Sequence, residues 1–126
     1  LVKPGSDSWL LFLPENEFHE IGLLFASYLL RFYGKKVIYL GCNLPVQSLT
    51  TVVKNTSPNN LLLFFVHHQL PNDTQEYLDN LSNLFKEKNI FVASHEKLTN
   101  GLKKRNNIRF LHSAEDLEKQ LFLSNV

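Results

Sequence analysis

The sequence is poor in several features that would have pointed to a particular class of protein. It has one cysteine, Cys42, so no internal disulfide can form, which is typical of a reducing compartment. Its net charge is only +1, which excludes the broad basic field that grips nucleic acid. No apolar run reaches the roughly 18 residues that a membrane span needs, and no signal peptide pattern is present. We therefore predict a cytoplasmic domain with no membrane partner.

Motifs of several catalytic and phosphate-binding classes are also missing. The turn at residues 14–17 is acidic and has no glycine, so it would repel phosphate and disfavours flavin and dinucleotide binding. No Gly-x-Ser-x-Gly elbow supports hydrolase chemistry, and we predict that the chain is not an enzyme. A phosphoacceptor receiver would need an aspartate after the third strand, where His67 stands instead.

The chain contains no methionine and begins at Leu1. We therefore expect it to be the C-terminal part of a longer polypeptide whose partner domain lies upstream. Its 126 residues have the size of one domain and can bury a core without disulfides or metals. With no internal repeat or linker, residues 1–126 are predicted to form a single domain.

Short apolar runs alternate with helical patterns along the chain. The runs cover residues 8–13, 37–40, 61–66, 89–93 and 108–111. Helical patterns cover residues 21–32, 46–54, about 73–88 and 96–100, and a last one follows Ser113. This alternation predicts an α/β fold of the Rossmann or flavodoxin-like type, with a five-stranded parallel sheet in the order 2-1-3-4-5 and helices on both faces.

The first helical pattern is apolar around most of its circumference. Six residues repeat at helical spacing and form the face that we predict to be buried: Ile21, Leu24, Phe25, Tyr28, Leu29 and Phe32. Leu23, Ala26 and Leu30 widen this face. We therefore predict a well-buried helix.

Histidines follow the predicted strands, at the sheet edge where ligands bind in open parallel sheets. His19 follows the first strand, and the others are His67, His68, His95 and His112. Imidazole is the commonest metal ligand, and Glu17 is spaced to hold the second ring nitrogen of His19. A closed metal site built from several histidines stays an alternative, although no pair has the His-x3-His spacing of such sites. For His95 and His112 we favour a role in helix capping or loop polarity.

The segment Glu17-x-His19-x-x-Gly22 resembles the Asp-x-His-x-x-Gly motif of cobalamin-binding domains. The similarity is closer to the effector domains of MerR-type bacterial regulators. It extends over Glu20-Ile21-Gly22-Leu23-Leu24 and over Tyr39-Leu40-Gly41-Cys42-Asn43-Leu44-Pro45. The resemblance implies that His19 is the lower axial ligand of the cobalt in a cobalamin, that Glu17 orients it, and that Gly22 gives the nucleotide tail room.

The family pattern continues with Ser-x-Leu after the third strand and Gly-Gly after the fourth, which line the slot for the displaced base. The corresponding positions here are Phe65-Val66-His67 and Ala93-Ser94. Phenylalanine in place of serine removes a hydrogen-bond donor and adds bulk. The resemblance thus implies a site made of Glu17, His19, Gly22, Phe65, His67, Ala93 and Ser94.

The resemblance also implies a role for the longer protein. DNA contact would come only through an N-terminal domain outside these residues, and the full-length regulator would be a homo-oligomer. The alternative is a domain of the same fold without a corrinoid, which serves dimerisation or interaction or senses another ligand.

Overall fold

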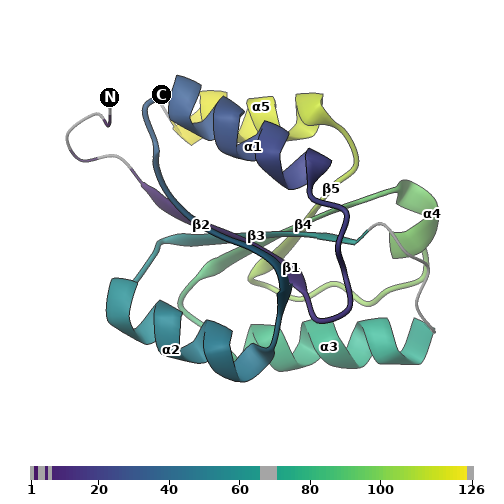
Figure 1. Cartoon of the computed structure of the whole chain (residues 1–126). Coiled ribbons are helices and arrows are strands. Elements are labelled where there is room, and N and C mark those ends of the chain that lie inside the picture. The colour runs from purple at the N-terminus through teal and green to yellow at the C-terminus, as the bar shows by residue number, and fades with distance from the viewer. Residues whose placement is uncertain (1, 3–4, 6, 66–70, 125–126) are drawn as a thin grey trace.

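The computed structural model of the chain describes residues 2, 5, 7–65 and 71–124, and it is built around one parallel sheet (Figure 1). The strands lie in the order β2-β1-β3-β4-β5, as predicted. Their bounds are β1 (Ser8–Pro14), β2 (Lys36–Leu44), β3 (Asn60–Phe65), β4 (Asn89–Ser94) and β5 (Ile108–Leu111). The strand order reverses between β1 and β3, so the carboxyl ends of these two strands form the switch point at which such sheets bind ligands.

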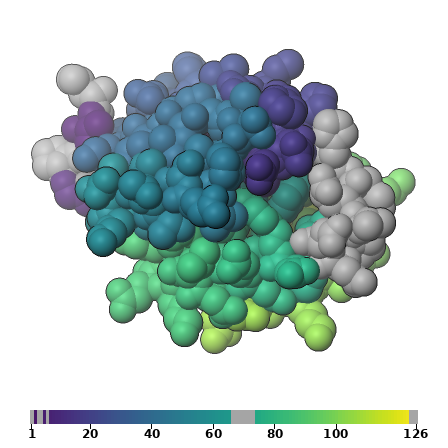
Figure 2. Space-filling view, turned by 60° about the horizontal axis from the view of Figure 1, so that its bottom comes forward, coloured from purple at the N-terminus to yellow at the C-terminus, as the bar shows by residue number. Residues whose placement is uncertain are grey.

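Helices cover both faces of the sheet, and each face has its own hydrophobic core. α1 (Ile21–Phe32) and α5 (Ala114–Ser124) lie on one face (Figure 1). α2 (Val46–Thr56) and α3 (Pro71–Leu84) lie side by side on the other (Figure 2). α4 (Glu96–Thr99) is a single turn between β4 and β5. In the part of the chain that the structure describes, no helix combines the length and apolarity needed to cross a bilayer.

Alternate residues of each strand supply the two cores. Leu11 and Leu62 pack with α1 and α5, whereas Leu10 and Leu63 pack with α2 and α3. Because successive side chains of a strand point to opposite faces, a strand buried on both sides is apolar at nearly every position. This is the physical reason for the unbroken apolar runs in the sequence.

Two element bounds differ from the prediction. β2 continues past Gly41, where a φ of 86° accompanies a shift of register against β1. Gly41 therefore makes a bulge in the strand and does not end it, as glycine with positive φ often does. α3 begins at Pro71, which suits the first position of a helix, so the expected capping box at Asp73 is wrong. α3 also ends at Leu84, before the expected bound near Lys88.

α1 buries the residues that the sequence analysis had placed at the margin of the predicted face. Leu23, Ala26 and Leu30 face the sheet, together with Ser27 and Leu29. Of the six residues predicted to be buried, five are exposed and only Leu29 is buried; the exposed ones are Ile21, Leu24, Phe25, Tyr28 and Phe32. The predicted face is therefore wrong. Both stripes are apolar, so periodicity cannot separate them, and the sheet packs against the one whose small residues, Ala26 and Ser27, allow close approach.

Candidate functional site

The loop between β1 and α1 is tied to the bulged end of β2. The Glu17 N–H donates to the Pro14 carbonyl at 3.0 Å, and the Asn43 N–H donates to the Glu17 carbonyl at 3.1 Å. The side-chain oxygen of Asn43 also accepts the Asn16 N–H at 2.9 Å. Asn43 has a φ of 56°, a conformation that asparagine tolerates better than most residues. The sequence analysis did not identify Asn43 as a residue that holds this loop. The signal that could have found it is an asparagine two residues after Gly41.

Glu17 and His19 form a hydrogen-bonded pair at the end of this loop. The His19 Nδ1 lies 3.1 Å from the Glu17 Oε1. The Glu17 side chain is only 3% exposed, whereas that of His19 is 55% exposed. When Nδ1 donates its proton to this carboxylate, Nε2 is the ring nitrogen that can bind a metal. A buried carboxylate therefore orients an imidazole that reaches the surface at the carboxyl edge of β1.

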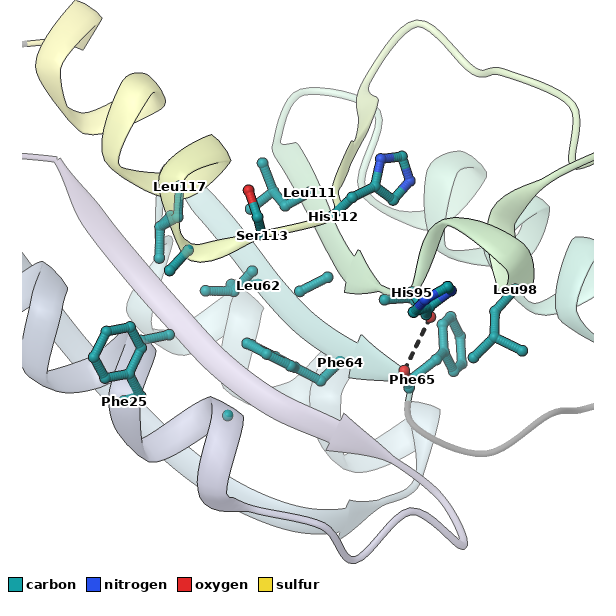
Figure 3. A pocket seen from close by; sticks show the side chains of 15 residues that line it. Phe25, Leu62, Phe64, Phe65, His95, Leu98, Leu111, His112, Ser113 and Leu117 are labelled. Carbon is teal, nitrogen blue, oxygen red and sulfur yellow. Dashed lines mark hydrogen bonds between the residues drawn. The ribbon is translucent and has the colours of Figure 1, made fainter.

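A cavity of about 390 Å³ opens at the same edge, between the sheet and helices α1 and α5 (Figure 3). This volume is within the range of small-molecule sites. Its interior is apolar, and its lining includes Phe25, Ala26, Leu62, Phe64, Leu111 and Leu117. Polar residues occupy its rim, namely Ser94, His95, His112 and Ser113. The arrangement suits a ligand with a flat apolar part that lies inside and a polar part at the opening.

The ring of Phe64 fills the space next to Gly22. A Cβ added to Gly22 would lie 2.6 Å from the Phe64 Cε2, closer than side chains approach one another. Gly22 therefore allows an aromatic ring of this chain to lie against the first turn of α1. The cavity extends from this ring toward α5.

Phe64 and Phe65 both line the cavity, and the sequence analysis named only Phe65. The Phe65 ring packs in the opposite core and meets the Tyr77 ring edge-on at 5.9 Å. Because successive side chains of a strand point to opposite faces, Phe64 packs against the core under α1 and α5 instead. Phe65 still borders the cavity, where its carbonyl accepts a hydrogen bond from the Ser94 Oγ at 3.0 Å (Figure 3).

Ala93 and Ser94 line the cavity at the end of β4. Together with Gly22 and Phe65, they are the predicted residues that the structure brings to this cavity, whereas Glu17 and His19 lie in the neighbouring loop. His67 and His68 lie outside the described residues.

Two further histidines serve local structure, as the sequence analysis favoured. The Nδ1 of His95 accepts the Lys97 N–H at 3.1 Å and so caps α4. The Nε2 of His112 lies 2.8 Å from the Thr99 Oγ1, which ties the end of β5 to α4. Among the described residues, no three side chains of histidine, cysteine, aspartate or glutamate lie together as a metal-binding group.

Glu20 forms a small polar cluster with Tyr39 and Cys42 of β2. The Tyr39 hydroxyl donates to the Glu20 Oε2 at 3.0 Å. Hydrogen bonds from the Cys42 thiol and then from Tyr39 lower the pKa of Glu20 below its usual 4.5. Burial and the bond to Glu20 raise the pKa of Tyr39 to about 12, and the bond to Glu20 raises that of Cys42. The thiolate fraction of Cys42 is thereby reduced, which argues against a reactive cysteine.

The Glu20 cluster predicts a dependence of stability on pH. Because the pKa of Glu20 is lower in the folded chain than in the unfolded one, the cluster stabilises the fold above the usual pKa of 4.5. This contribution is lost as the pH falls through the folded-state value. We expect the thermal midpoint of the wild type to fall more steeply below about pH 4.5 than that of Glu20→Gln. Glu15→Gln, an exposed residue of the same loop, is the control. Equal slopes for wild type and Glu20→Gln would contradict the assignment.

Comparison with solved structures gives similar folds. A novel cobalamin-binding protein from Desulfitobacterium hafniense DCB-2 matches with a TM-score of 0.73 and 19% identity over 96% of this chain. The methanol:cobalamin methyltransferase complex MtaBC from Methanosarcina barkeri matches with a TM-score of 0.71 and 17% identity over 95% of this chain. The monomethylamine corrinoid protein of Methanosarcina barkeri matches with a TM-score of 0.65 and 14% identity over 92% of this chain.

This chain spans only part of each of these proteins, namely 58%, 47% and 57% of their respective lengths. At such low identity the likeness establishes the fold, which is that of the domains found in these cobalamin and corrinoid proteins. No protein-family model matches the sequence, and neither does any curated protein.

Proposed function

We propose that this chain is a ligand-sensing domain that binds a cobalamin, with His19 as the lower axial ligand of cobalt. The observation that carries the proposal is the Glu17–His19 pair, in which a buried carboxylate orients an exposed imidazole at the sheet edge. Metal-bound histidines commonly donate their second ring N–H to a carboxylate, which fixes the ring and raises its basicity. The fold shared with cobalamin-binding and corrinoid proteins supports the same ligand.

The cavity can take part of this group, although Phe65, Ala93 and Ser94 depart from the family pattern. An apolar space of about 390 Å³ adjoins α1 and α5 and is large enough for an aromatic base. The base would contact the Phe64 ring, since this ring already fills the space at Gly22. Ser94 and Ser113 supply hydroxyl groups at the rim for the polar part of the tail.

Each residue of the site would have a distinct task. His19 would bind the metal through Nε2, and Glu17 would hold its ring through Nδ1. The hydrogen bonds from Asn43 to the loop would keep this pair in place against the pull of a large ligand. A bound cobalamin would supply a cobalt centre whose upper ligand can be exchanged or lost, and this is the event that the domain would sense.

We further propose that the domain is the effector part of a MerR-type transcription regulator in the cytoplasm. Support comes from the segments at residues 20–24 and 39–45, which are more similar to those regulators than to other cobalamin-binding domains. DNA contact would then belong to a different domain of the regulator. The net charge of +1 agrees with a domain that does not itself bind DNA.

A cobalamin titration tests the proposal. The purified chain is mixed with hydroxocobalamin or adenosylcobalamin in the dark, and the absorption spectrum is recorded before and after gel filtration. We expect the wild type to keep its colour and to give a spectrum with an imidazole as the lower ligand. His19→Ala should bind at least about tenfold more weakly and lose that signature. Glu17→Gln should keep the signature with reduced affinity, since it acts by positioning His19.

Control variants separate ligation from general damage. Glu15→Gln changes an exposed residue of the same loop that does not line the cavity, and it should leave the lower-ligand spectrum unchanged. Free imidazole should restore the signature to His19→Gly. A wild-type chain that folds normally but stays colourless would refute the proposal.

In that event the second candidate function is an interaction module without a corrinoid. Two observations favour it specifically. The Phe64 ring lies against Gly22, and α1 presents a broad apolar face to solvent.

A further inference from the structure

The outer surface of α1 is unusually apolar for a helix that covers a sheet. Large side chains project from it and from the loop before it, and each is about half exposed or more. They are Phe18, Ile21, Leu24, Phe25, Tyr28 and Phe32, which we call the α1 face. Ile21 is 85% exposed and Phe32 is 72% exposed, so the sheet and α5 leave these side chains uncovered.

The α1 face continues onto α5. The rings of Tyr28 and Phe32 stack at 6.3 Å, and Phe32 meets the Tyr33 ring edge-on at 5.7 Å. Tyr33 in turn lines a shallow groove with Phe122 and Leu123 at the end of α5, both of which are exposed. Apolar side chains therefore extend along α1 and across to the last turn of α5, where Glu118 and Lys119 also line the groove.

The size of this surface is that of a protein interface. An aromatic side chain carries roughly 150–250 Å² of surface, so the half-exposed or more exposed rings each offer about 100 Å². With Ile21, Leu24 and the α5 residues, the total is on the order of the 800 Å² that each partner buries in a stable dimer. Monomeric proteins rarely expose a contiguous apolar patch of more than a few hundred Å².

The pattern along α1 indicates which partner fits. Ile21, Phe25, Tyr28 and Phe32 follow one another at spacings of four, three and four residues. This is the heptad seam by which one helix packs against another. Arg31 is the single charged residue of α1, so the face can meet an identical face without burying opposed like charges. A seam that is apolar and nearly uncharged is self-complementary, which is the requirement of a two-fold interface.

The charges at the two ends of α1 favour an antiparallel arrangement. Glu15 and Glu20 precede the helix, whereas Arg31 and Lys36 are at or beyond its C-terminal end. Antiparallel helices bring the acidic end of one copy to the basic end of the other, and their macrodipoles are also opposed. Parallel helices would bring like charges together at both ends.

We propose that two copies of this chain associate through their α1 faces, with the two α1 helices packed antiparallel around a two-fold axis. The interface uses no residue of the Glu17–His19 pair. Phe25 belongs to the α1 face and also lines the cavity, so the association is measured without cobalamin.

Sedimentation velocity across a wide range of protein concentration tests the association. We expect the wild type to be a dimer that dissociates on dilution, and Tyr28→Glu and Phe32→Glu to be monomers with dissociation constants raised at least about a hundredfold. Leu84→Glu is the matched control, since Leu84 is 47% exposed but lies on α3, on the opposite face of the sheet. The control should stay dimeric. Circular dichroism and thermal melts establish that each variant is folded.

Disulfide trapping tests the antiparallel arrangement. Ile21→Cys and Phe32→Cys are each made in a Cys42→Ser background, so that the new thiol is the only one in the chain. A mixture of the two variants should form the mixed disulfide faster than either variant forms its own. Faster self-pairing of each variant alone would overturn the antiparallel arrangement.

A wild-type chain that stays monomeric at the highest concentration overturns the proposal. The α1 face would then be covered by another segment or another protein. Flotation of the chain with anionic lipid vesicles, abolished by Tyr28→Glu, would likewise overturn it in favour of a membrane surface. All these measurements are made without cobalamin, so their failure is distinct from a failure of corrinoid binding.

Discussion

Leu30→Ala is expected to lower the free energy of unfolding by about 3 kcal/mol, because it leaves a cavity between α1 and the sheet. Leu30 is completely buried in the core shared by β1, α1 and α5. Neighbouring side chains in a close-packed interior fill such a cavity only in part. Urea unfolding followed by circular dichroism measures the change, at a protein concentration low enough to keep the chain monomeric.

Tyr28→Ala is the matched control for this prediction. Tyr28 lies on the same helix, two residues earlier, but it is 64% exposed. Its truncation should cost no more than about 0.5 kcal/mol in the monomer, as for other surface substitutions. A larger loss for Tyr28→Ala than for Leu30→Ala would mean that α1 packs by the face originally predicted from the sequence. The pair of variants therefore decides which stripe of α1 meets the sheet.

Gly22→Ala is expected to force the Phe64 ring out of its place and into the neighbouring cavity. The added methyl group would lie 2.6 Å from the Phe64 Cε2. Overpacking of this kind costs about 1–3 kcal/mol, offset in part by the better helix propensity of alanine. We therefore expect a net loss of stability of about 1 kcal/mol. If the cavity binds cobalamin, the displaced ring should also weaken binding about tenfold, or by 1.4 kcal/mol.

A double-mutant cycle with Phe64→Ala tests the physical cause. In the Phe64→Ala background the clash is gone, so Gly22→Ala should be neutral or stabilising by up to about 1 kcal/mol. We expect a coupling energy between the two sites of about 2 kcal/mol from urea unfolding. Additive effects would show that Gly22 serves some purpose other than room for Phe64.

Local sequence patterns determined most of the scaffold. Apolar runs such as residues 61–65 are typical of strands buried on both faces, and their alternation with helical segments led to the correct sheet order. The cap that His95 forms agrees with the capping or loop polarity favoured from the chain alone. The last helix begins after Ser113, as predicted, and the Ser113 Oγ accepts the Asp116 N–H. These features depend on interactions between residues close in the sequence or on general rules of chain topology.

The spacing of Glu17 and His19 is another local feature. One residue, Phe18, separates them in the chain, and their side chains meet at 3.1 Å. The burial of Glu17, in contrast, depends on the loop's attachment to Asn43, which is distant in sequence. The sequence indicated the pair, and the tertiary structure supplied its rigidity.

Only the tertiary structure decided which side of α1 is buried and which face of β3 carries each of the two phenylalanines. α1 has two apolar stripes of similar hydrophobicity, and the choice between them depends on how closely Ala26 and Ser27 let the helix approach the strands. Phe64 and Phe65 are adjacent and chemically identical, so only the register of β3 against β1 and β4 assigns their faces. Contacts between elements far apart in the chain settle both choices, and one-dimensional periodicity does not contain that information.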